Sequence, residues 1–196
     1  MHTIYITPQI AQDIAKVATS TNKHERAVLQ AVELRIKDGI LEACCTDGKL
    51  LLWATHEIAT DEEFSALLPQ ALVKSIASVA TAAAKSKAQW IRLDYRAEEQ
   101  VMTASIDADL GMSLSGTTLT EMYPPWRNAI PNYGGRQPGE AVIAIALSAR
   151  NLQILSKVYG DAELIFDFHG PIKSVCFEAV RGNPIKGIIM PVTLPE

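Results

Sequence analysis

The sequence predicts an α+β fold made of three copies of one unit, each a strand followed by a helix and three more strands. Two observations predict this fold. Apolar residues recur at helical spacing in three short segments, and runs of alternating apolar and polar residues follow each segment. The chain has 196 residues, of which 48% are apolar and 20% are charged. Such a chain can bury a substantial core in one large domain or in two small ones.

The first unit is predicted from a capped helix and the turns after it. A helix is expected over residues 8–19, because Thr7 is a favourable N-cap and Pro8 suits the first helical position. Its apolar side chains recur at helical spacing: Ile10, Ile14 and Val17. Three strands are then expected, because residues 32–36 alternate and the turn sequence Thr-Asp-Gly at residues 46–48 separates two further apolar runs.

The second unit repeats this order. A short apolar run at residues 64–68 precedes a helix whose apolar side chains again share one face: Leu72, Ile76, Val79 and Ala83. Three apolar runs follow and are expected to be strands: residues 91–95, 101–106 and 110–114. The second unit therefore copies the first.

The third unit begins with a predicted strand at residues 141–147, and Ser148 is expected to cap the helix that follows it. The apolar side chains of that helix are Leu152, Leu155 and Val158. Its three later strands are expected at residues 164–168, 175–177 and 185–192. Many α+β proteins show loosely similar alternation, so the repeat alone does not identify a family.

A linker is predicted between the second and third units. Residues 132–139 contain glycines and prolines that cannot continue a helix or a central strand. We therefore predict a complete two-unit domain at residues 1–131, the linker, and a half domain at residues 140–196.

Charge and cysteine content exclude several classes of protein. The net charge of −4 and the pI near 5.6 argue against a surface that coats nucleic acid or anionic membrane indiscriminately. The three cysteines, two of them the neighbours Cys44 and Cys45, cannot form a disulfide framework, which favours a reducing compartment. The first residues carry no basic start before an apolar run, and the longest apolar run is too short to cross a bilayer. A cytoplasmic location is expected.

The sequence carries no recognisable catalytic or metal-binding motif. It has no glycine-rich phosphate loop, nucleophile elbow or Ser/His/Asp signature. The four histidines are scattered and none has a second ligand at metal-binding spacing: His2, His24, His56 and His169. We therefore expect no enzyme activity, no cofactor and no metal, with surface or structural roles for the histidines.

Three segments resemble parts of the bacterial DNA polymerase III beta subunit, the sliding clamp. Residues 123–131 read Tyr-Pro-Pro-Trp-Arg-Asn-Ala-Ile-Pro and resemble the Phe-Pro-Asp-Tyr-Arg-Arg-Val-Leu-Pro segment that joins the second and third clamp domains. Leu29 and residues 46–48 resemble the clamp's leucine and its Thr-Asp-Gly turn, at the same separation. Residues 188–192 resemble the carboxy-terminal Val-Val-Met-Pro-Met. The segments occur in the same order as in the family.

The resemblance implies a clamp-like fold in which residues 1–131 correspond to the second clamp domain and residues 140–196 to the latter half of the third. In that family the three segments meet at an apolar groove that binds short linear motifs of partner proteins. The residues that would line this groove here are Arg26, Leu29, Thr46, Gly48, Leu51, Pro124, Asn128, Ala129, Ile188, Met190 and Pro191. A methionine-lined, proline-stiffened groove suits apolar peptides, because thioether side chains repack around different guests.

The chain departs from the family pattern at the rim of this groove. Residues 49–51 read Lys-Leu-Leu where the family has His-Arg-Leu, and Asn128 and Thr193 replace arginines. The preference for particular peptides is therefore expected to differ. The alternative interpretation is that some of the proposed groove residues are ordinary core residues: Leu29, Ile188 and Met190.

Basic residues are concentrated on the predicted helices. The predicted helices carry one acid, Asp13, against six basic residues: Lys16, Lys74, Lys85, Lys87, Arg150 and Lys157. Clamps turn their helices towards the DNA inside a ring, so the resemblance implies non-specific phosphate contacts by these residues. The alternative is that lysine is simply a good helix former on solvated faces.

The function predicted from the resemblance is that of a sliding-clamp-like accessory protein in DNA replication or repair. It would support processivity by tethering partner proteins that carry a clamp-binding motif, and it would contact double-stranded DNA non-specifically. A non-encircling binding module that competes for, or recruits, clamp-binding proteins is the alternative. A small-molecule enzyme on the same scaffold is a third class, but the sequence shows no polar pocket for it. A homo-oligomer, at least a dimer through residues 140–196, is expected because the third unit lacks a partner unit.

Overall fold

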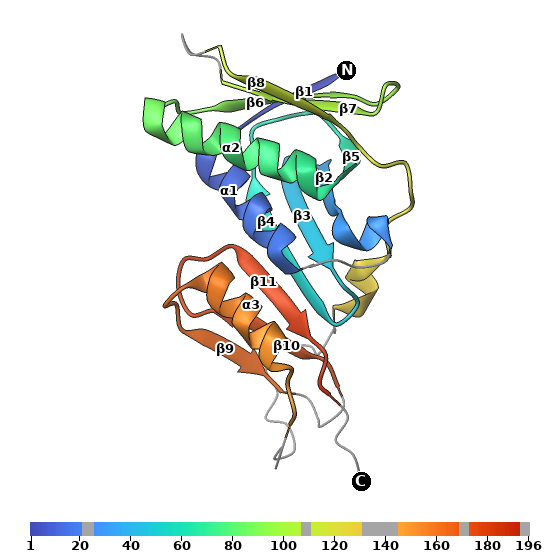
Figure 1. Ribbon diagram of the computed structural model, residues 1–196, viewed down its shortest axis with the longest axis vertical. Coiled ribbons are helices and arrows are strands. Elements are labelled where there is room, and N and C mark those ends of the chain that lie inside the picture. Colours follow the sequence, from blue (N-terminus) through green and yellow to red (C-terminus); the bar gives the residue numbers. More distant parts are fainter. Residues whose placement is uncertain (21–25, 107–110, 131–144, 169–172, 193–196) are drawn as a thin grey trace.

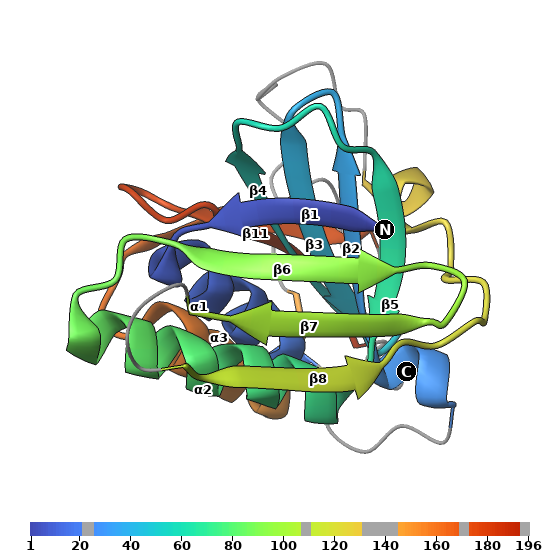
Figure 2. The same ribbon diagram turned by 90° about the horizontal axis from the view of Figure 1, so that it is seen from above.

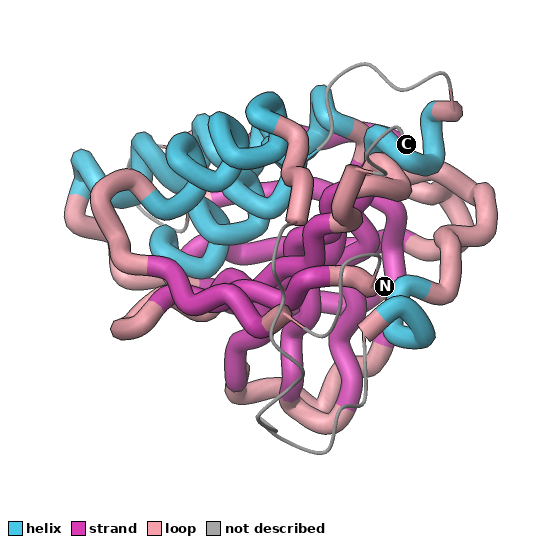
Figure 3. Tube along the Cα trace, turned by 90° about the horizontal axis from the view of Figure 1, so that it is seen from below, coloured by secondary structure: helices cyan, strands magenta, loops and turns pink. Residues whose placement is uncertain are grey.

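The structure, a computed structural model, describes residues 1–20, 26–106, 111–130, 145–168 and 173–192. Its fold is α+β and is built from strand-helix-strand units, as predicted. The α-helices gather on one side of the strands (Figures 1 and 3). None of the helices in the described ranges is long and apolar enough to span a membrane.

The first unit contains every predicted element. Its elements are β1 (His2–Ile6), α1 (Pro8–Val17), β2 (Val32–Lys37), β3 (Ile40–Thr46) and β4 (Leu50–Glu57). Thr7 caps α1 as expected, because its hydroxyl accepts a hydrogen bond from the amide of Ile10 at 3.3 Å. The α-helix ends at Val17 and continues as a 3-10 turn, Ala18–Ser20, so the predicted end falls inside that turn.

The second unit agrees with the prediction except in its last strand. Its elements are β5 (Phe64–Leu68), α2 (Gln70–Ser86), β6 (Ile91–Arg96), β7 (Val101–Ser105) and β8 (Ser113–Thr117). The predicted strand at residues 110–114 starts too early, and its first residue lies outside the described ranges. Gly116 explains the error: a Cβ there would be 3.0 Å from Leu72 of α2, so the strand packs on the helix without an apolar side chain at that position.

The third unit contains a helix and three strands. They are α3 (Ala149–Tyr159), β9 (Leu164–Asp167), β10 (Val175–Ala179) and β11 (Ile185–Ile189). Ser148 occupies the N-cap position as predicted, although its side chain makes no capping hydrogen bond. Most of the predicted first strand, residues 141–144, lies outside the described ranges, and its remainder pairs through a single bridge between Ala146 and Val192.

The strands form two antiparallel sheets. The four-stranded sheet has the order β1-β6-β7-β8 and is seen face-on in Figure 2. The seven-stranded sheet has the order β5-β2-β3-β4-β11-β10-β9 and runs through both halves of the molecule in Figure 1. The first two units exchange their first strands, because β1 pairs with β6 and β5 pairs with β2. Neither unit therefore completes its sheet alone.

The third unit continues the sheet of the first. β11 pairs with β4, with Ile185 opposite Ala54 and Ile189 opposite Leu50. The expectation that the third unit has no partner within the chain is therefore corrected for this edge of its sheet. Gly187 allows the ring of Phe177 to lie across β11, since a Cβ there would come within 2.1 Å of that ring. The predicted linker, residues 132–139, lies outside the described ranges, so the predicted domain boundaries stay predictions.

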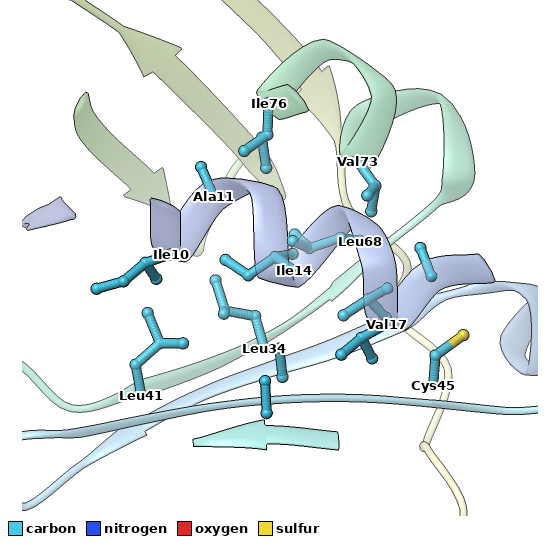
Figure 4. Packing of buried hydrophobic residues seen from close by; sticks show 14 of the residues in the cluster. Ile10, Ala11, Ile14, Val17, Leu34, Leu41, Cys45, Leu68, Val73 and Ile76 are labelled. Carbon is cyan, nitrogen blue, oxygen red and sulfur yellow. The ribbon is translucent and has the colours of Figure 1, made fainter. Parts of the chain in front are cut away.

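The main core lies between the helices and the sheets. Figure 4 shows the apolar face of α1 directed into this core, with Ile14 and Val17 close to Leu34 and Leu68. Burying these aliphatic side chains contributes about 1.5–3 kcal/mol each before the entropy of ordering is subtracted. The three helices and both sheets share this core.

One polar pair is buried beside the core. The carboxylate of Asp13 in α1 lies 3.5 Å from Nε2 of His56 in β4, and the Asp13 side chain is 2% exposed. Burial lowers the pKa of His56, and the opposing attraction of Asp13 does not reverse that effect. The Asp13 carboxylate also accepts a hydrogen bond from Gln9 at 3.0 Å and lies 3.4 Å from the ammonium of Lys16. His56 is therefore held mainly neutral at pH 7.

Candidate functional site

The turn between β3 and β4 is fixed by its own side chains. The hydroxyl of Thr46 donates to the carbonyl of Leu50 at 3.0 Å and accepts from the amide of Gly48 at 3.0 Å. Oδ1 of Asp47 accepts from the amides of Lys49 and Leu50, both at 2.9 Å. Gly48 has a φ of 83°, which favours glycine. The Thr-Asp-Gly sequence is thus the chemical cause of a rigid turn at this place.

Tyr123 ties the chain after β8 to this turn. The amide of Thr46 donates to the Tyr123 hydroxyl at 3.1 Å, and that hydroxyl donates to the carbonyl of Cys44 at 3.4 Å. Burial raises the pKa of Tyr123, so the hydroxyl stays protonated and can donate. The proline-rich segment that begins at Pro124 is therefore held against β3.

The 3-10 helix Trp126–Ala129 is anchored on β2 and β3. The indole N–H of Trp126 donates to a Glu33 carboxylate oxygen at 2.6 Å. The guanidinium of Arg127 lies 4.3 Å from the centre of the Trp126 ring and forms ion pairs with Glu33 and Glu42. Trp53 of β4 lies at 6.0 Å from the Trp126 ring, centre to centre. These contacts fix Trp126 in an inward, buried orientation.

The end of β11 completes the site. The amide of Met190 donates to the carbonyl of Lys49 at 2.9 Å, which joins the carboxy-terminal segment to the β3–β4 turn. Ile188 is 4% exposed, whereas the side chain of Met190 remains 43% exposed. Ile188 therefore belongs to the base of the site and Met190 to its rim.

These three segments enclose a small apolar groove with a volume of about 230 Å³. We call it the apolar groove. Its lining residues are Thr46, Gly48, Lys49, Leu50, Leu51, Pro124, Pro125, Trp126, Ala129, Ile188 and Met190. Beneath it lies a second, smaller core cluster that contains Cys44, Leu51, Tyr123, Trp126 and Ile188. The floor of the groove is therefore also core, whereas its rim is accessible.

The structure brings together seven of the eleven groove residues proposed from the sequence. They are Thr46, Gly48, Leu51, Pro124, Ala129, Ile188 and Met190. The alternative interpretation of Ile188 as a core residue also has support, since its side chain is buried. Met190 is exposed and does not fit that alternative.

Four proposed residues lie outside the lining. Arg26 and Leu29 belong to the segment around the 3-10 helix Ala27–Gln30, where Val28 instead packs on the second core cluster. Asn128 is exposed and Pro191 is half-buried next to Met190. Asn128 and Pro191 adjoin lining residues in the sequence, whereas Arg26 and Leu29 do not, and none of the four lines the apolar groove.

Sequence reasoning missed four residues that line the apolar groove: Lys49, Leu50, Pro125 and Trp126. Trp126 and Pro125 lie inside the matched segment at residues 123–131, so the resemblance already contained a signal for them. Lys49 and Leu50 stand where the chain departs from the family pattern, so the resemblance contained no signal for them.

The proposed DNA-facing cations lie on or next to the helix layer. Lys74, Lys85, Arg150 and Lys157 are exposed on α2 and α3, and Lys87 follows α2 as its left-handed C-cap with a φ of 58°. Lys16 differs because it is only half-exposed and pairs with buried Asp13. That acid is the single one within α1, α2 and α3, so the outer side of these helices exposes basic but no acidic side chains.

A depression of about 560 Å³ lies between the three helices. Two of the cations, Lys74 and Lys157, line it together with polar and small residues that include Gln30, Gln70 and Thr19. No group of three or more His, Cys, Asp or Glu side chains is placed to hold a metal ion within the described ranges.

Comparisons with known proteins place the fold. No protein-family model and no curated protein sequence matches the chain. Among solved structures, the chain is similar to the DNA polymerase III beta subunit of Thermotoga maritima, with a TM-score of 0.80 at 15% identity, over 98% of this chain and 66% of that one. It is also similar to the beta sliding clamp of C. crescentus, with a TM-score of 0.80 at 14% identity, over 99% and 66% of the two chains. A sliding clamp of Pseudomonas aeruginosa gives a TM-score of 0.79 at 12% identity, over 98% and 66%.

The resemblance suggested by three short segments is thus confirmed at the level of the fold, and it extends over nearly all of this chain. At such low identities the likeness establishes architecture rather than activity. The chain has the fold of the sliding clamp of bacterial DNA polymerase III, the beta subunit, in a shortened form that spans about two thirds of a clamp chain.

Proposed function

We propose that this protein is a sliding-clamp-like accessory protein of DNA replication or repair, which tethers partner proteins through the apolar groove. The observation that carries the proposal is the convergence of three segments, distant in the sequence, on one groove. The segments are residues 46–51, 124–129 and 188–190. The clamp fold of the chain supports the same role.

The size and chemistry of the apolar groove favour a peptide anchor. Its volume of about 230 Å³ is below the range of roughly 300–1,000 Å³ that encloses drug-sized ligands, so it suits one or two apolar side chains of a longer partner. Leu51, Ile188 and Trp126 supply an apolar surface, and Met190 supplies an adaptable rim. The partner would be a replication or repair protein with a short motif that contains glutamine, leucine and phenylalanine.

The expected affinity is modest. An anchor that buries on the order of 200 Å² of apolar surface gains roughly 5 kcal/mol, from which ordering and association costs are subtracted. A dissociation constant in the micromolar range or weaker follows. Titration calorimetry of the protein with such a peptide is the direct test, and absence of heat at millimolar peptide would reject the groove as a docking site.

Contact with double-stranded DNA is the second part of the proposal. Lys74, Lys85, Arg150 and Lys157 are exposed on α2 and α3, and neither helix contains an acidic residue. Such contacts would be non-specific and weakened by salt, because each neutralised phosphate releases counterions. They require no catalytic group and no cofactor, and a location in the cytoplasm would suit them.

A non-encircling binding module is the second candidate. The likeness to the sliding clamps extends over about two thirds of a clamp chain, and a groove that binds peptides does not itself require a ring. Retention on nicked circular DNA separates the two candidates: loss of the retained protein when the DNA is linearised supports a ring, whereas equal binding to circular and linear DNA supports the module.

A further inference from the structure

The first two units complete each other by exchanging strands. In each unit the strand before the helix leaves its own sheet and pairs with the strand after the helix of the other unit. β5 pairs with β2, with Leu68 opposite Val32, and β1 pairs with β6, with Ile6 opposite Ile91. We call β2 and β6, the strands that follow the helices, the receiving strands. In both pairs the residue directly before the helix N-cap lies opposite the first residue of the receiving strand.

The third unit has a receiving strand whose outer edge is not paired. β9 follows α3 as β2 and β6 follow their helices, and it ends the seven-stranded sheet (Figure 1). The carbonyl of Glu163 accepts from the amide of Val180 on the β10 side. Because the direction of the backbone groups alternates, the N–H and C=O of Leu164 and Phe166 point to the outer edge, where no described strand pairs with them.

The third unit also has a donor segment with the same position as β5. Leu67, two residues before the N-cap of α2, forms a bridge with Leu119 after β8. Ala146, two residues before the N-cap of α3, forms the same bridge with Val192 after β11. The amide of Val192 donates to the carbonyl of Ala146, so the backbone groups of residues 145 and 147 point the other way.

α3 also lacks a contact that the other two helices have. Four residues after the N-cap, Ala11 of α1 and Val73 of α2 are 0% and 2% exposed, respectively, where α1 and α2 pack side by side (Figure 4). Leu152 holds this position in α3 and is 42% exposed. Its neighbours on the same helix face, Ala149 and Ser156, are uncharged. The face of α3 that corresponds to the α1–α2 contact therefore lacks a partner helix within the described ranges.

We propose that a second copy of this chain supplies both missing contacts. Residues 145–147 of each copy add to the outer edge of β9 in the other copy, and the two α3 helices pack side by side through Leu152. The register follows from the exchange between the first two units: Leu147 lies opposite Leu164 of the other copy, and Ile145 lies opposite Phe166. The contact is two-fold symmetric and closed, and it converts two half domains into one complete domain.

Two features support this register independently. The β9–β10 pairing turns the backbone groups of Leu164 and Phe166 outward, and the separate Ala146–Val192 bridge does the same for residues 145 and 147. These are the residues that the register places opposite one another. The side chains of Ile145, Leu147, Leu164 and Phe166 all contact the main core but remain partly exposed, as expected for a contact that is incomplete in one copy.

The dimer is tested with the full chain by sedimentation velocity or light scattering over a concentration series. The parent is expected to be a dimer in the micromolar range. Leu152→Glu should weaken the dimer at least about tenfold, because its two carboxylates would be desolvated without partners. Gln153→Glu, which adds the same charge at the adjacent exposed residue of α3, should leave it unchanged. A monomeric parent at high micromolar concentration, or equal dimerisation of both variants, would overturn the proposal.

Disulfide cross-linking tests the register. The variant with Leu147→Cys and Leu164→Cys should give a covalent dimer on oxidation, because directly opposite residues bring their Cα atoms to about 5.5 Å. Leu147→Cys with Ile165→Cys is the matched control, since a shift of one residue turns the thiol to the other face. Equal cross-linking of the two pairs would refute the register. Monomeric Leu152→Glu should still bind peptide in the apolar groove, so loss of the dimer and loss of tethering are separate outcomes.

Discussion

Removing the hydroxyl of Tyr123 tests whether the apolar groove is built as described. In Tyr123→Phe the amide of Thr46 loses its acceptor at 3.1 Å, and the carbonyl of Cys44 loses the weaker bond at 3.4 Å. Both groups lie in a buried environment, since Tyr123 is 8% exposed and Cys44 is 0% exposed. The substitution therefore leaves a buried donor without a partner rather than exchanging one partner for water.

The size of the effect follows from that environment. A buried polar group that loses its partner costs about 1–3 kcal/mol, and the aromatic ring keeps its apolar contacts, so no cavity penalty is added. We expect the free energy of unfolding to fall by about 1–3 kcal/mol in Tyr123→Phe. Peptide affinity should also fall, by roughly threefold or less, because the turn at residues 46–48 stays fixed by its own hydrogen bonds.

Chemical denaturation monitored by tryptophan fluorescence measures the change. Tyr5→Phe is the control, because Tyr5 is 47% exposed, so removing its hydroxyl leaves no buried group without a partner. That variant should lie within about 0.5 kcal/mol of the parent. An equally small change in Tyr123→Phe would show that the hydroxyl does not hold the groove together.

Three further outcomes follow from particular contacts. Gly187→Ala should lower the free energy of unfolding by about 1–3 kcal/mol in denaturation experiments, since the new Cβ would come within 2.1 Å of the Phe177 ring; no change would show that β11 can shift freely. Because the pKa of His56 in the folded protein is below its ordinary value of 6.5, despite Asp13, the unfolded state binds more protons, and stability should fall as the pH drops from 7 through 6. His56→Gln should flatten this part of the pH profile, and an unchanged profile would assign it to other groups. Lys74→Ala should reduce the salt dependence of DNA binding by about one counterion without changing peptide affinity; an unchanged slope in fluorescence anisotropy would remove this lysine from the DNA-facing set.

The sequence predicted the elements better than their connections. Period and capping located α1, α2 and α3 because their apolar faces pack on one continuous core. The predicted bounds of β8 were wrong because Gly116 stands at an inward position where an apolar side chain would be expected. The close approach of Leu72 fills that space. The exchange of first strands could not be predicted from periodicity, since alternation shows which face is buried but not which strand lies alongside.

The candidate site was predicted largely through its three matched segments. Thr46 and Gly48 could be identified because their turn chemistry is local. Trp126 was missed because its orientation depends on a hydrogen bond to Glu33, which is distant in the sequence and also pairs with Arg127. Arg26 was assigned to a wall by analogy alone, and local sequence contains no information about how far it lies from the groove.

Titration calorimetry with Met190→Asp tests the central claim, that the apolar groove docks a peptide of the clamp-binding type. Met190 is 43% exposed at the rim, so docking would bury the rest of its side chain, and aspartate would place a desolvated carboxylate there without a partner. The parent and Lys85→Ala, which changes an exposed residue of α2, should bind the peptide with the same micromolar or weaker affinity, and Met190→Asp should show no measurable heat. Binding of Met190→Asp as tight as that of the parent would contradict the assignment of the groove.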